Sequence, residues 1–102
     1  ENFFESLPEQ LCLLHNSLVE LSCSRCELLK LPHKIHQLTA LVRLQLSHNA
    51  LNTIPDSFSS LTMLRYLDLD FNKIAAIPIA IGKLTRLQEL CLEDNPIREV
   101  SR

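Results

Sequence analysis

Apolar residues recur along the chain with a period of 23 residues. Residues 64–70 alternate apolar and polar at their centre, which is the period of a strand with one buried face. The same pattern recurs at residues 18, 41 and 87, and a repeat of this length is typical of stacked units. We therefore predict short parallel strands whose inward side chains are these: Leu18, Leu21, Cys23, Leu41, Leu44, Leu46, Leu64, Leu67, Leu69, Leu87, Leu90 and Leu92.

One polar column follows each predicted strand. It holds an asparagine in three units and Cys26 in the first. A buried asparagine side chain both donates and accepts, so it can satisfy loop backbone groups that stacking removes from water. We expect Asn49, Asn72 and Asn95 to form a structural ladder, continued by Cys26. A thiol is a poor donor, so we expect the turn at Cys26 to be weaker.

A proline column then ends each strand region, at Pro32, Pro55 and Pro78. Proline breaks a strand and starts a different segment. The apolar residues that follow, such as Ile81 and Leu84, recur at three-residue spacing, which fits an irregular or 3₁₀ turn facing the core. The pattern predicts an α/β repeat solenoid, with a short parallel sheet on its concave side and irregular or 3₁₀ segments on its convex side.

The unit reads L-x-x-L-x-L-x-x-N-x-L-x-x-I-P-x-x-I-x-x-L and resembles the leucine-rich repeat. Its 23-residue length is similar to that of intracellular repeats of the Scribble, Ras-suppressor and plant intracellular Ras-group types. The resemblance implies a horseshoe fragment that acts as a protein–protein interaction module of an intracellular signalling scaffold or adaptor. It suggests small GTPases, phosphatases or kinases as partners, without choosing among them.

The repeat register divides the chain into one leucine-rich-repeat domain over residues 1–102. We expect a half repeat over residues 1–17, repeats starting at residues 18, 41 and 64, and a partial last repeat over residues 87–102. Neither end shows a polar cap over the terminal core. We therefore expect a piece of a longer protein or, as an alternative, self-association through uncapped ends.

The composition of the chain excludes several classes of function. The chain has 102 residues, a formal net charge of −2 and a single glycine. One glycine excludes a glycine-rich phosphate loop, and a charge near zero gives no drive toward nucleic acid or an anionic membrane. No Asn-x-Ser/Thr site occurs, which favours a cytoplasmic location. We expect no cofactor.

Solvent-facing residues between the core leucines line the expected concave face. In its C-terminal half, carboxylates surround two aromatic side chains, which suits a protein partner with a basic and apolar contact surface. A solvated face that only keeps the sheet soluble is the alternative. The candidate partner-binding residues are Tyr66, Asp68, Asp70, Phe71, Glu89, Glu93, Arg43 and Arg65.

Catalysis is not expected. A calcium site at Asp68 and Asp70 would need about six oxygen ligands, which a flat sheet rarely converges. A glycosidase would need a deep cleft between two carboxylates. The remaining enzymatic alternative is that the chain is the recognition module of a multidomain kinase, nuclease or ubiquitin ligase.

The cysteines suggest a zinc site, because Cys12-x-x-His15 and Cys23-x-x-Cys26 have ligand-like spacing. Those residues would have to converge from two sides of the solenoid. Cys23 and Cys26 also occupy columns where a small buried residue is expected. We therefore expect neither zinc nor a Cys23–Cys26 disulfide, and we expect Cys91, in an outward column, to be the most reactive thiol.

Overall fold

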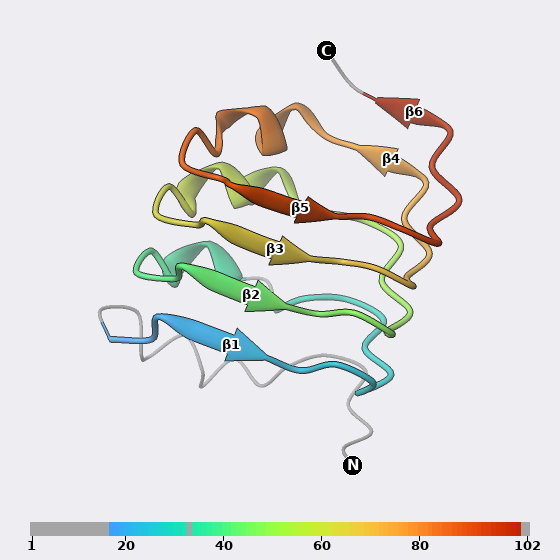
Figure 1. Cartoon of the computed structure of the whole chain (residues 1–102), viewed down its shortest axis with the longest axis horizontal. Coiled ribbons are helices and arrows are strands. Elements are labelled where there is room, and N and C mark those ends of the chain that lie inside the picture. Colours follow the sequence, from blue (N-terminus) through green and yellow to red (C-terminus); the bar gives the residue numbers. More distant parts are fainter. Residues whose placement is uncertain (1–16, 33, 101–102) are drawn as a thin grey trace.

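A computed structural model describes residues 17–32 and 34–100 (Figure 1). Within them, four strands form one parallel sheet in the order β1-β2-β3-β5. The strands are β1 (Glu20–Ser22), β2 (Arg43–Gln45), β3 (Tyr66–Asp68) and β5 (Glu89–Cys91). Paired residues are 23 positions apart throughout, as in the row Leu21, Leu44, Leu67 and Leu90. The predicted parallel sheet is confirmed.

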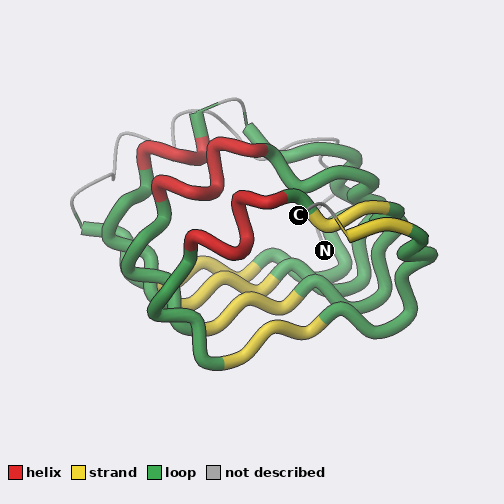
Figure 2. Tube along the Cα trace, turned by 90° about the horizontal axis from the view of Figure 1, so that it is seen from above, coloured by secondary structure: helices red, strands yellow, loops and turns green. Residues whose placement is uncertain are grey.

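Three 3₁₀ segments lie opposite the sheet: η2 (Ile35–Gln37), η3 (Asp56–Ser60) and η4 (Ile79–Lys83). Figure 2 shows the two layers, with strands on one side and 3₁₀ turns on the other. Pro55 and Pro78 are extended and precede η3 and η4, because proline lacks the N–H that a continuing ladder would need. The predicted solenoid with 3₁₀ convex segments is therefore confirmed.

The core lies between these layers. Leu44 and Leu67 are fully buried, and the convex side contributes Phe58 and Leu61, also fully buried. The corresponding side chains of the last described unit, Leu87, Leu90 and Leu92, are only half-buried. The repeat pattern thus identifies the core side chains, and burial decreases at the last strand.

The structure adds a feature that the pattern does not predict. Strands β4 (Ala76–Ile77) and β6 (Glu99–Val100) pair in parallel as a second, two-stranded sheet. β4 lies between the asparagine column and the proline column, and β6 lies at the equivalent positions 23 residues later, where the sequence pattern predicts no strand. The expected half repeat lies outside the described residues except for Ser17, as do Cys12 and His15 of the zinc hypothesis.

Candidate functional site

The parallel register aligns the outward side chains of the sheet in rows across the strands. We call this surface the concave face. One row contains Glu20, Arg43, Tyr66 and Glu89, and the next contains Ser22, Gln45, Asp68 and Cys91. The register therefore brings most of the predicted binding residues onto one surface, as the 23-residue period requires.

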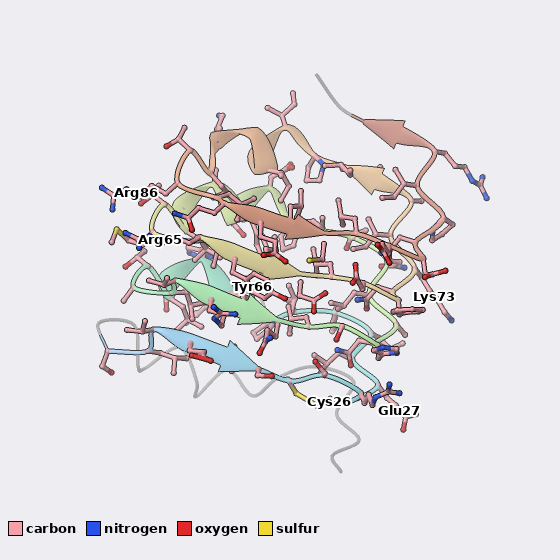
Figure 3. The ribbon with its side chains drawn as sticks, in the orientation of Figure 1. Cys26, Glu27, Arg65, Tyr66, Lys73 and Arg86 are labelled. Atoms are coloured by element: carbon pink, nitrogen blue, oxygen red, sulfur yellow. A yellow bond between two sulfur atoms is a disulfide. The ribbon has the colours of Figure 1, made fainter. Side chains whose placement is uncertain are left out.

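Tyr66 lies at the centre of this face, on β3 (Figure 3). The Arg43 guanidinium lies 4.5 Å from the centroid of the Tyr66 ring, within the range of a cation–π contact. Burial raises the pKa of the Tyr66 hydroxyl, and the nearby Asp68 carboxylate raises it further. Tyr66 is therefore a neutral aromatic group, half-exposed and held by a cation from the neighbouring strand.

A shallow hollow of about 300 Å³ lies beside Tyr66. Arg65 lies at the edge where the strands begin, as Figure 3 shows. The two guanidinium groups that line this hollow, those of Arg43 and Arg65, can bind carboxylates or stack on flat groups of a partner. The lining residues are Val42, Arg43, Arg65, Tyr66, Gln88 and Glu89.

Carboxylates occupy the opposite end of β3 and β5. Asp68 accepts the backbone N–H of Asp70 at 3.1 Å, and Asp70 accepts that of Glu93 at 2.7 Å. These bonds fix the two aspartates in place while Glu93 remains exposed. A fixed acidic edge beside an aromatic group is complementary to a partner that carries lysine or arginine.

Phe71 lies just beyond these carboxylates, 44% exposed. Its ring stacks on His48, with ring centroids 4.3 Å apart and planes at 10°. Both residues have left-handed backbone torsions, with φ of 57°, as do Asp94 (57°) and Arg25 (60°) in the same column. A positive φ is costly for a residue with a bulky side chain, so the rest of the turn must hold the Phe71 backbone in this conformation. The exposed Phe71 ring is therefore held in place.

The acidic group does not fit a metal site. Ligand atoms of Asp68, Asp70 and Cys91 lie within 4.8 Å of one another. Calcium prefers six to eight oxygen ligands, and one oxygen of each aspartate already accepts a backbone N–H. The three residues are better described as an acidic part of the concave face.

Cys91 is half-buried and is the free cysteine among the described residues. Its pKa is raised, first by burial, then by its hydrogen bond to Glu89, and further by the charges of Asp68 and Asp70. Because the thiolate is the nucleophile, this environment lowers the reactivity of Cys91 at neutral pH. The expectation that Cys91 is the most reactive thiol of the chain stays a prediction, because it compares Cys91 with the other cysteines.

The three asparagines form the predicted ladder. The Asn49 side-chain amide donates to the Cys23 carbonyl of the previous unit at 2.9 Å, and its oxygen accepts the N–H groups of Cys26 and Leu28, both at 3.0 Å. Asn72 is buried and donates to the Leu46 carbonyl at 3.0 Å. Asn95 closes the next turn in the same way. Each asparagine thus ties its own loop to the preceding one.

The first turn differs, because Cys23 and Cys26 form a disulfide. This bond was not predicted, and the expectation of two reduced, buried cysteines is wrong. That expectation rested on the burial of each column taken alone, and Cys26 is indeed buried while Cys23 is half-buried. The missed signal was that both departures from the repeat pattern fall in one unit, three residues apart. In the structure their Cα atoms lie 5.9 Å apart, within the range of a disulfide.

Four more residues take part in the site than the candidate set contained. Val42 and Gln88 line the hollow, the Gln45 side chain lowers the pKa of Tyr66, and the His48 ring stacks on Phe71. The register was the available signal, because residues 23 positions apart on adjacent strands are neighbours. His48 and Phe71 are one such pair.

The chain matches a family model described as "Leucine rich repeat" over residues 16–74 and a second, described as "Leucine Rich repeats (2 copies)", over residues 62–101. Comparison with curated proteins found no match. No helix among the described residues is long and apolar enough to cross a membrane.

Solved structures resemble the chain as well. The ectodomain of the Arabidopsis thaliana membrane receptor kinase GASSHO1/SCHENGEN3, solved in complex with CASPARIAN STRIP INTEGRITY FACTOR 2, has a TM-score of 0.81 and 36% identity. The ectodomain of the receptor kinase SOBIR1 from the same plant has a TM-score of 0.69 and 26% identity. A leucine-rich-repeat protein of Leptospira interrogans has a TM-score of 0.64 and 26% identity.

These matches cover 93%, 93% and 96% of this chain, respectively. The chain spans only 12%, 65% and 36% of the matched chains.

Proposed function

The chain belongs to the leucine-rich-repeat family, and we propose that it binds a protein partner on its concave face. Modules of this family generally mediate protein–protein interaction and are typically non-catalytic. The observation that carries the proposal is the arrangement around Tyr66. An aromatic ring held by Arg43 lies beside the fixed carboxylates of Asp68 and Asp70.

The chemistry of this surface favours a partner with basic and apolar side chains. Aromatic anchors supply much of the binding free energy in protein interfaces, and surrounding charges select the partner and its orientation. Tyr66 and Phe71 are the two anchors, and Glu89 and Glu93 are exposed carboxylates next to them. The nearby Arg65 extends the surface toward acidic groups of the same partner.

We propose that the host protein is a cytoplasmic signalling scaffold or adaptor. The resemblance to 23-residue intracellular repeats and the absence of Asn-x-Ser/Thr sites support this. Imaging of the full-length protein, tagged at its C-terminus, tests the location. Signal within the cytoplasm agrees with the proposal, and secretion into the medium contradicts it.

A second candidate is the recognition module of a multidomain enzyme. Two of the similar structures are ectodomains of receptor kinases, and this chain covers only part of each. In that case the concave face would select the partner, while catalysis would take place in another domain. The full reading frame distinguishes the candidates, because a kinase, nuclease or ubiquitin-ligase domain would support the second.

Self-association is a further candidate, favoured by the half-buried leucines of the last described unit. Leu64, Leu67 and Leu69 are at most 1% exposed, whereas their equivalents Leu87, Leu90 and Leu92 are half-buried. Apolar side chains at a sheet edge can pack against a second copy. Sedimentation velocity tests this, because a mass that stays monomeric at high concentration contradicts it.

The main proposal is tested by a comparative pull-down from cell lysate with quantitative mass spectrometry. One bait is the unmodified protein, and a second carries Glu89→Lys and Glu93→Lys on the concave face. A matched control carries Glu27→Lys and Asp56→Lys, two exposed carboxylates outside that face. All three are checked by circular dichroism.

A protein held by the unmodified and control baits but lost from the concave-face variant supports the proposal, and it is then purified for direct binding. Equal capture by all three baits contradicts it.

A further inference from the structure

The turn after each strand closes between the same two positions. In three units the asparagine side chain donates to the carbonyl three residues before it: Asn49 to Leu46 at 3.0 Å, Asn72 to Leu69 at 3.0 Å, and Asn95 to Leu92 at 3.1 Å. The bond spans the turn that carries the left-handed residues His48, Phe71 and Asp94. It therefore holds the turn in a conformation that its own residues do not favour.

In the first unit a covalent bond joins those same two positions. Cys26 stands in the asparagine column, Cys23 stands three residues before it, and their sulfur atoms form a disulfide (Figure 3). Arg25 in this turn has φ of 60° and Glu27 has φ of 59°, so two left-handed residues lie in or next to the turn. The disulfide replaces the hydrogen bond that asparagine supplies in every other described unit.

From this equivalence we propose that Cys23 and Cys26 form a reversible thiol–disulfide site that locks the first turn when oxidised and releases it when reduced. Two thiols of a reductant such as glutathione give their protons to the two cysteine sulfurs. The S–S bond between Cys23 and Cys26 breaks as a new S–S bond forms between the two reductant molecules. Two electrons and two protons thus pass from the reductant to the cysteines. Oxidation by a low-molecular-weight disulfide is the reverse reaction.

The reduced turn loses its closing bond without a substitute of equal strength. A thiol is a weak donor, and Cys26 Sγ lies 3.6 Å from the Ser24 carbonyl oxygen, a long contact. No asparagine amide stands in this position to donate to the residue three before it. The left-handed torsions of Arg25 and Glu27 are then held only from the next unit, by the Asn49 side chain, which donates to the Cys23 carbonyl and accepts the Cys26 N–H.

Release is confined to this turn, because the next unit holds its outer side. The Asn49 oxygen still accepts the N–H groups of Cys26 and Leu28, and Leu28 is fully buried. The Cys23 N–H donates to the Gln45 carbonyl at 2.9 Å, as in the rest of the sheet. The change thus reaches the end of the concave face that carries Ser24 and Arg25, and leaves β3 and β5 intact.

Hydrogen exchange tests the proposal in the full chain with Cys12→Ser and Cys91→Ser, so that only this pair can react. After oxidation with glutathione disulfide, we expect iodoacetamide to label neither cysteine, and to label both after reduction. We expect reduction to speed exchange about tenfold over residues 23–28 and to leave residues 66–72 unchanged. The matched control adds Cys23→Leu and Cys26→Asn, which restores the repeat pattern. We expect its exchange over residues 23–28 to be the same with and without reductant.

Three results overturn the proposal. Labelling of both cysteines after oxidation shows that the bond does not form. Equal exchange over residues 23–28 in both redox states shows that the bond does not hold the turn. A rise in exchange across the whole chain shows that the bond supports the entire fold and not this turn alone.

Discussion

The two halves of the concave face share one strand register and differ in their outward side chains. Just after β1 and β2, the hydroxyl groups of Ser24 and Ser47 lie 3.0 Å apart and hydrogen-bond to each other. At the equivalent positions after β3 and β5, the Asp70 carboxylate accepts the N–H of Glu93. At this position the first half therefore pairs two neutral hydroxyl groups, whereas the second half places carboxylates there.

This difference distinguishes the inward side chains, which stabilise the fold, from the outward side chains, which can select a partner. Inward columns repeat from unit to unit because each unit must pack against the next. Outward columns are free of that constraint, so their chemistry can change from strand to strand. We propose that the binding chemistry is concentrated on β3 and β5, and the following predictions test that proposal.

The largest expected effect is on stability, through the asparagine ladder that both halves share. Asn49→Ala and Asn72→Ala each remove a side chain that both donates and accepts in the ladder, and leave backbone groups without a partner. We expect each to lower the free energy of unfolding by about 2–4 kcal/mol. Urea unfolding measures this. Similar losses in both halves agree with a shared framework, and a loss in one half only contradicts it.

Removal of the central aromatic ring has the next largest effect. We expect Tyr66→Ala to weaken binding of the identified partner about 30-fold, because the ring is the best-held anchor on the face. Glu20→Ala, in the same row on β1, serves as the control and should change the affinity less than about threefold. Isothermal titration calorimetry compares the two. Equal losses would show that the halves are not distinct.

Phe71→Gly separates binding from stability at one position. Glycine takes a positive φ without steric cost, so relief of backbone strain offsets the lost stacking on His48. We expect the free energy of unfolding to change by less than about 1 kcal/mol, while binding weakens about tenfold. Arg25→Gly makes the same backbone change on the first strand and should leave binding unaltered. A large loss of stability in Phe71→Gly would refute this account of the position.

The smallest effect is a dependence of stability on pH. The folded state raises the pKa of Cys91 and of Tyr66 above their ordinary values of 9.0 and 10.0. Both groups therefore stay neutral in the folded chain at pH values where the unfolded chain ionises. The stability they contribute is full below about pH 9 and is lost as the pH rises further.

Thermal unfolding between pH 8 and pH 11 checks this on the unmodified chain and on Cys91→Ser. We expect Tm to fall above about pH 9, and the fall to begin later in Cys91→Ser, where only Tyr66 remains of the pair. Identical curves for the two proteins would show that Cys91 does not contribute.

The sequence predicted the fold well because side-chain columns report directly which face is buried. The strands, the 3₁₀ turns and the rows of the concave face all follow from a period of 23 residues. The same columns do not encode backbone torsion, so the left-handed column of Phe71 was not predicted. The Cys23–Cys26 bond was missed because it depends on two substitutions taken together.

The β4–β6 pair was missed for a related reason, because its residues follow no alternating pattern that would predict a strand. The reactivity of Cys91 stays a prediction, because its pKa depends on burial and on the carboxylates of Glu89, Asp68 and Asp70, which its column alone does not report. The site was thus predictable where register alone sets it, and not where neighbouring side chains act on one another.

The most direct test of the central claim compares the two halves column by column. One variant carries Glu89→Lys and Glu93→Lys, and the other carries Glu20→Lys and Ser24→Lys at the equivalent positions of the first strand. Affinity for the purified partner is measured by isothermal titration calorimetry at fixed salt. We predict at least a tenfold loss for the first variant and less than about threefold for the second. Equal losses, or a larger loss for the second variant, would contradict the claim that β3 and β5 carry the binding chemistry.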